Sequence, residues 1–120
     1  MGHLCFVEGS IRHAVFGEPN PVEHWRLLFA PGTQPTTDAS EYPPFDEVLA
    51  KYRELRAGTL QRLDEMGNSG LAIPPKSIPL GFEEVMQTGG QALLLLTLHN
   101  MVHYGQIADA RRVAGREPLL

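Results

Sequence analysis

The sequence of 120 residues has only one cysteine, Cys5, so no disulfide can form within the chain. A small domain held together by disulfides is thereby excluded, and a lone cysteine is typical of the reducing cytoplasm. Long apolar runs are also missing. The longest, residues 92–96, is far shorter than the about 20 residues that a membrane-spanning helix needs. We therefore expect a cytoplasmic protein with no membrane partner.

Basic residues are scarce as well. Ten Lys and Arg face 14 Asp and Glu, which gives a formal net charge of −4. A nucleic-acid-binding protein usually carries a basic patch or run, and none is visible here, so no nucleic-acid partner is expected. The length suits one domain and not two, and we predict a single domain over residues 1–120.

Apolar spacing predicts an all-α chain. The predicted helices cover the first residues up to 16, then 21–29 and 45–66, and finally 89–113 with Thr88 as its cap, and glycine or proline lies near most of their ends. A long polar connection spans residues 33–44. Prolines make regular helix unlikely over residues 68–87, where short extended segments around 71–73 and 78–82 are an option.

Only three of the predicted helices are long, whereas an up-down helix bundle usually has four. The chain also enters helical spacing abruptly at Met1-Gly2-His3-Leu4, with no capping residue before it. We therefore expect a bundle whose N-terminal helix is truncated, with long loops between the remaining helices. Such a remnant would expose apolar helix faces, and exposed apolar faces of this kind usually mark interfaces. The expected assembly is a homodimer that restores the bundle.

The predicted helix around residues 93–107 is strongly apolar before His99, and we expect it to be largely buried. His99 and His103 are four residues apart, so both side chains lie on one helix face, with Cβ atoms about 5–6 Å apart. The pair could be two buried, hydrogen-bonded core residues. It could equally bind one metal ion, which would offset the desolvation of two imidazoles. Asn100 stands where zinc proteases of the HExxH type have glutamate, so no general base is supplied there.

A metal site needs a third ligand, and His3 is the natural candidate because it shares the apolar face of its helix with Val7. Three histidines would leave at least one coordination position open, as in reactive metal sites. As a residue taken alone, His3 would more often lie on the surface.

Three further residues are candidates for catalysis or for positioning a ligand. Gln106 shares the face of the histidine pair and could orient a ligand. Glu8 could supply a carboxylate, and Tyr104 could reach a pocket wall, although a surface Glu8 is the commoner outcome. Three other residues have simpler expected roles. Cys5 is expected in the core, His13 is expected as a solvated cation at a helix end, and His24 is not expected to be a metal ligand.

Taken together, these motifs resemble the DinB/YfiT-like superfamily of four-helix bundles. The resemblance is carried in order by His3-Leu4 with Glu8, by His99-x-x-x-His103 followed by Gly105-Gln106-Ile107, and by the closing Arg112, Gly115 and Pro118. It implies a divalent metal, nickel, zinc or similar, held by His3, His99 and His103. Some family members are transferases or isomerases that use a low-molecular-weight thiol such as glutathione, mycothiol or bacillithiol.

The leading functional hypothesis is therefore a metal-dependent thiol S-transferase or isomerase with a small-molecule substrate. A bound metal could lower the pKa of such a thiol and present it as a thiolate. One alternative is a metal-dependent hydrolase, which lacks an obvious general base apart from Glu8. Another is a non-catalytic, stress-related binding or assembly module in which the metal is structural.

Overall fold

The computed structural model describes residues 1–118, and all regular structure in this part of the chain is helical. The elements in order are α1 (Gly2–Phe16), the 3-10 turn η1 (Glu23–Trp25), α2 (Arg26–Phe29), the 3-10 turn η2 (Ala39–Glu41), α3 (Phe45–Leu71) and α4 (Gly89–Val113). The all-α prediction is confirmed. The single helix predicted over residues 21–29 is instead divided between η1 and α2.

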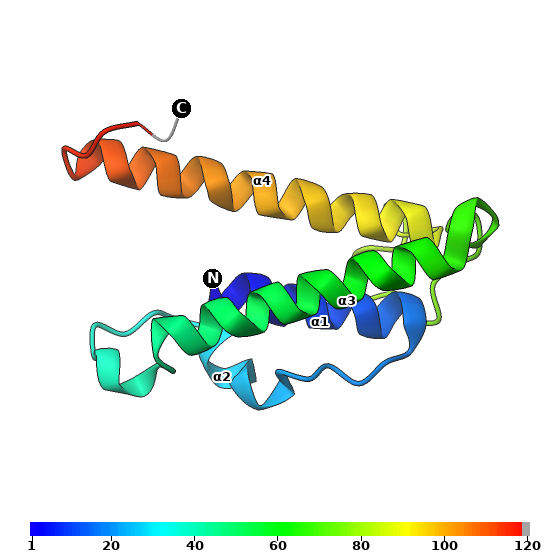
Figure 1. Cartoon of the computed structure of the whole chain (residues 1–120), viewed down its shortest axis with the longest axis horizontal. Coiled ribbons are helices and arrows are strands. Elements are labelled where there is room, and N and C mark those ends of the chain that lie inside the picture. The colour runs from blue at the N-terminus through cyan, green and yellow to red at the C-terminus, as the bar shows by residue number, and fades with distance from the viewer. Residues whose placement is uncertain (119–120) are drawn as a thin grey trace.

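Helix α1 is the centre of the fold, because it contacts α2, α3 and α4 (Figure 1). Its first half packs with η1 and α3 in a core that includes Cys5 and Trp25, which confirms the prediction for Cys5. Its second half packs with α4 in a second core that includes Val15 and Leu96. The two cores fix the start of α1 relative to both α3 and α4.

The helix ends follow their sequence signals. Gly17 ends α1 with φ of 74°, and Gly115 follows α4 with φ of 65°, a conformation that favours glycine. At the other end of α4, the Thr88 side chain accepts a hydrogen bond from the Gln91 N–H, while the Gln91 side chain accepts one from the Thr88 N–H. This capping box confirms the predicted start of α4.

The region after Met66 matches the prediction in part. Gly67, with φ of 58° and ψ of −176°, is not helical, so the first helical segment of α3 ends at Met66 as predicted. The chain then resumes a second, short helical segment to Leu71, which the prediction lacked. The extended segments proposed around 71–73 and 78–82 form no strand anywhere in residues 1–118.

The prediction that α4 is largely buried is also wrong. Its buried residues are Gly89, Ala92 and Leu96, whereas Leu94 is 58% exposed and Met101 is 61% exposed. The reason is that α1 and α3 pack on one side of α4 only, and the C-terminal part of α4 extends past the start of α1 (Figure 1).

Across residues 1–118, the helices are too short or too polar to cross a lipid bilayer.

Candidate metal centre

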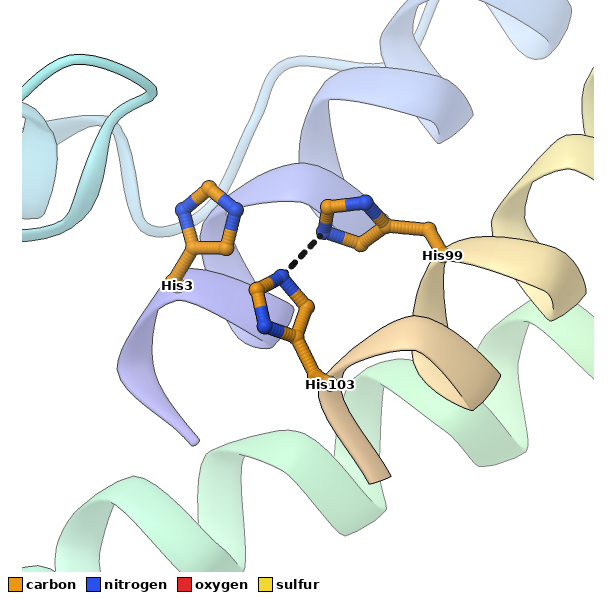
Figure 2. Close-up of side chains that lie close together, drawn as sticks. All are labelled: His3, His99 and His103. Atoms are coloured by element: carbon orange, nitrogen blue, oxygen red, sulfur yellow. Dashed lines mark hydrogen bonds between the residues drawn. The ribbon is translucent and has the colours of Figure 1, made fainter. Parts of the chain in front are cut away.

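Three histidines from two helices meet where α4 passes the start of α1. His3 lies in the first turn of α1, and His99 and His103 lie one turn apart on α4, with the three rings turned toward one another (Figure 2). The His3 ring centroid is 5.1 Å from that of His99 and 5.0 Å from that of His103. One ligand nitrogen from each residue lies within 4.8 Å of the other two. The fold therefore brings together the three residues that the sequence singled out.

A backbone carbonyl at the end of α2 sets the tautomer of His3. Nδ1 of His3 donates a hydrogen bond to the carbonyl oxygen of Phe29 over 2.7 Å. Since a carbonyl only accepts, the proton must reside on Nδ1, and the lone pair of Nε2 is left for a metal. The neighbouring Gly2 makes this approach possible, because a Cβ there would lie 2.4 Å from the Phe29 ring.

The two histidines of α4 present their Nε2 atoms to each other at 3.1 Å. Nδ1 of His103 donates to Oε1 of Gln106 over 2.8 Å, which leaves its Nε2 as the ligand atom. Two nitrogens bound to one zinc ion at about 2.0–2.1 Å each lie about 3–3.4 Å apart. The observed spacing and the neutral nitrogen donors therefore fit a divalent metal ion.

The electrostatic environment favours the neutral imidazole of His99. All three histidines are half-buried. The pKa of His99 is lowered from its ordinary value, first by burial and then by the proximity of His103 and His3. Neutral imidazole is the form that binds metal ions. The cluster contains no carboxylate, so a bound divalent ion would keep its full positive charge for other ligands.

The sequence model of a protein family, the DinB superfamily, matches residues 1–107, a stretch that includes all three histidines. The chain belongs to the DinB superfamily. This confirms the resemblance found in the sequence, although Arg112, Gly115 and Pro118 lie beyond the matched residues. No curated protein and no solved structure shows significant similarity to the chain.

Gln106 accepts a hydrogen bond from His103, one of the three histidines that could hold a metal ion in this DinB-superfamily chain. Replacing Gln106 with leucine removes the acceptor for Nδ1 and frees the ring to rotate. We expect metal affinity to fall about 10–100-fold, as for other outer partners of metal ligands. Titration with a competing metal-chelating dye measures this change. Gln106→Glu keeps an acceptor oxygen and should retain affinity; an equal loss in both variants would contradict the positioning role.

Glu8, the candidate carboxylate, lies against α3 and not against the histidines. The Thr59 hydroxyl donates to its Oε1 over 2.7 Å, and Nη2 of Arg56 forms an ion pair with Oε2 at 3.1 Å. Although both Glu8 and His3 belong to α1, His3 faces α4. The side chain of Glu8 is completely buried, and no contact of the centre supports a catalytic role for it.

Burial makes Glu8 a source of pH-dependent stability. It raises the pKa of the Glu8 carboxyl above its ordinary value of 4.5, an effect only partly offset by Thr59, Arg56 and Arg12. The folded state thus holds the proton more tightly than the unfolded state. The stabilising contribution of Glu8 to the free energy of unfolding is fully present below pH 4.5 and is lost as the pH rises through the pKa of the folded state.

We therefore expect wild type to lose stability relative to Glu8→Gln between about pH 4 and pH 7. Urea unfolding of both proteins at each pH measures the difference. A difference that is constant or grows in favour of wild type with rising pH would refute the assignment.

The remaining candidates lie outside the centre. Tyr104 is one position past His103, about 100° round the helix, and is 38% exposed. His13 is exposed at the end of α1, where its Nδ1 donates to the Glu18 carbonyl over 2.9 Å. His24 is exposed beside the Trp25 ring. His13 and His24 thus take the places predicted for them, whereas a catalytic role for Tyr104 stays a prediction.

A large apolar cavity adjoins the centre and was not predicted from the sequence. It has a volume of about 910 Å³, lies between α1 and α4, and is lined in part by the connection before α4. His99 and Val102 belong to its wall. The aliphatic and aromatic residues of that connection, Ile78 and Phe82, gave no signal because nothing in their local pattern relates them to α1.

Proposed function

We propose that His3, His99 and His103 bind one divalent ion, nickel, zinc or similar, and that the protein is a metal-dependent thiol S-transferase or isomerase. The observation that carries this proposal is a half-buried cluster of three histidines with an apolar cavity beside it. Three neutral nitrogens leave coordination positions for an exogenous ligand, and half-burial leaves room for it to approach. A closed structural site usually supplies four protein ligands instead.

A divalent ion in this site would lower the pKa of a bound low-molecular-weight thiol and make its thiolate available near neutral pH. The chain's own groups prepare the site. The Phe29 carbonyl and Gln106 keep protons on Nδ1 of His3 and His103. The cavity wall that includes Val102 places apolar surface beside His99. In the transfer, sulfur bonds to the electrophile, the leaving group departs with its electron pair, and the thiol proton passes to solvent.

The test is thiol transfer by metal-loaded protein. Glutathione, mycothiol and bacillithiol are each offered with 1-chloro-2,4-dinitrobenzene and with a panel of other electrophiles. We expect the protein to accelerate conjugation with at least one thiol, and we expect His103→Ala to lack this activity. Metal-loaded protein that accelerates none of these reactions would refute the proposal.

A structural metal is the second candidate, and the packing of α4 favours it. Because α4 packs on one side only, a metal ion bound by residues of both helices would link α4 to α1 near the point where α4 extends past the start of α1. In that case His103→Ala lowers the melting temperature while no thiol-dependent turnover is found for either protein. A hydrolase receives no such support, because the cluster lacks a carboxylate and Glu8 is engaged by α3.

We also propose a homodimer formed through the outer face of α4. Leu94 and Met101 are more than half exposed on this face, and a Cβ at the nearby Gly105 would meet nothing within 4 Å. A second copy could bury this apolar surface. Light scattering at micromolar concentration should give twice the chain mass for wild type and the single mass for Met101→Lys. A wild-type monomer would exclude the dimer.

The remaining elements of the proposal concern partners and location. The net charge of −4 argues against a nucleic-acid partner, and the cavity beside His99 supports a small-molecule substrate. The unpaired, buried Cys5 supports a cytoplasmic location.

A further inference from the structure

The cavity beside His99 has mainly apolar walls. Val7 and Ile11 of α1 form one side, Leu95 of α4 forms another, and Phe82 and Met86 come from the connection before α4. Its volume of about 910 Å³ lies within the about 300–1,000 Å³ that is usual for small-molecule sites. The space is therefore large enough for an organic molecule and offers it mainly carbon surface.

The polar side chains at the cavity wall have partners within the chain. The Asn20 side chain donates to the hydroxyl of Ser10 and to a backbone carbonyl of α1. Arg26 forms a solvent-exposed ion pair with Glu23, and Nδ1 of His13 donates to the Glu18 carbonyl. The rest of the wall is apolar and favours an uncharged molecule, because a charge placed against it would lose water without gaining a partner.

We infer that this cavity binds an uncharged, apolar organic molecule. This inference rests on the proposed function, in which the molecule is the electrophile of the thiol transfer. The thiols considered above carry charged groups and do not suit these walls, whereas an apolar electrophile does. His99 contributes to both the cavity wall and the histidine cluster, so a molecule in the cavity lies beside the metal centre.

The reaction class follows from this arrangement. The substrate is an apolar alkyl or aryl compound with a leaving group such as halide. The thiol sulfur forms a bond to the carbon that carries the leaving group. The carbon–halogen bond breaks, halide departs with the electron pair, and the thiol proton goes to solvent. No oxidant or reductant is needed.

A second copy of the chain is the competing occupant. Leu94 and Met101, on the proposed dimer face of α4, do not belong to the cavity wall, whereas Leu98, one turn after Leu94, does. The two surfaces therefore adjoin on α4, and the dependence of ligand binding on dimerisation distinguishes the two occupants.

The test measures binding of the uncharged fluorophore Nile red to the full chain, with and without added zinc. Phe82→Gln should weaken binding about tenfold, because an apolar wall group is replaced by a polar one. Leu80→Gln is the matched control, since Leu80 lies in the same connection but is 94% exposed and outside the cavity wall. It should bind within about twofold of wild type. Phe82→Leu should restore most of the affinity, and circular dichroism checks the fold of each variant.

A second arm uses glutathione with benzyl bromides whose para-alkyl group grows from methyl to butyl. KM should fall with alkyl length in wild type and lose this trend in Phe82→Gln. Equal Nile red binding by the Phe82 and Leu80 variants overturns the inference, as does dye binding that disappears when the protein dimerises. Dye binding that depends on Phe82, without any thiol transfer, supports the apolar site and instead refutes the proposed transferase.

Discussion

Replacing His99 by alanine is expected to leave the protein unable to retain a divalent ion. His99 supplies one of three converging nitrogens, and its Nε2 lies 3.1 Å from that of His103. Loss of a direct ligand should reduce affinity by more than the about 10–100-fold that loss of an outer partner costs. Elemental analysis after dialysis should find about one ion per wild-type chain and none in the variant.

The same variant should lose the stabilisation that metal confers on the folded state. At a metal concentration of 100 times the dissociation constant, wild type gains about 2.7 kcal/mol, and His99→Ala should gain almost nothing. His13→Ala is the control, because His13 is exposed at the far end of α1 and makes no part of the cluster. Equal metal content in His99→Ala and wild type would contradict the assignment.

Leu96→Ala is expected to cause the largest loss of stability outside the centre. Leu96 is 2% exposed and, with Ala92, forms the main buried contact of α4 with the second core. Truncation of a buried leucine to alanine costs about 2–5 kcal/mol, because apolar contact is lost and a cavity remains. Urea unfolding measures the change in the free energy of unfolding.

The position of Leu96, one turn before His99, gives this variant a second readout. A looser α4 holds His99 and His103 less firmly opposite His3, so metal affinity should fall together with stability. Val113→Ala is the control on the same helix, because Val113 is 85% exposed, lies outside the proposed dimer face and should cost less than about 0.5 kcal/mol when truncated. Similar losses in both variants would show that α4 does not dock as described.

The sequence predicted most of what depends on local pattern. Helical spacing and cap residues located α1, α3 and α4, and the four-residue interval placed His99 and His103 on one face. The same periodicity placed His3 on the inner face of α1. Gln106 was found because it shares the face of the pair, and its hydrogen bond to His103 bears this out.

Features that depend on tertiary packing could not be read in the same way. The run before His99 is apolar on every side, a pattern that favours a buried helix, yet only one side of α4 is covered by the chain. The partner of His3 is a backbone carbonyl at Phe29, which has no side-chain signature. Glu8 was considered for the centre because it is close to His3 in the sequence. It lies five residues after His3 on α1, however, and its side chain faces α3.

The central claim is that His3, His99 and His103 together bind the metal. X-ray absorption at the metal edge of the loaded protein tests it most directly. The account predicts three imidazole nitrogens at about 2.0–2.1 Å, with one or more lighter donors from solvent, and a loss of imidazole scattering in His3→Ala. A sulfur shell at about 2.3 Å, or a spectrum with no imidazole scattering, would contradict it.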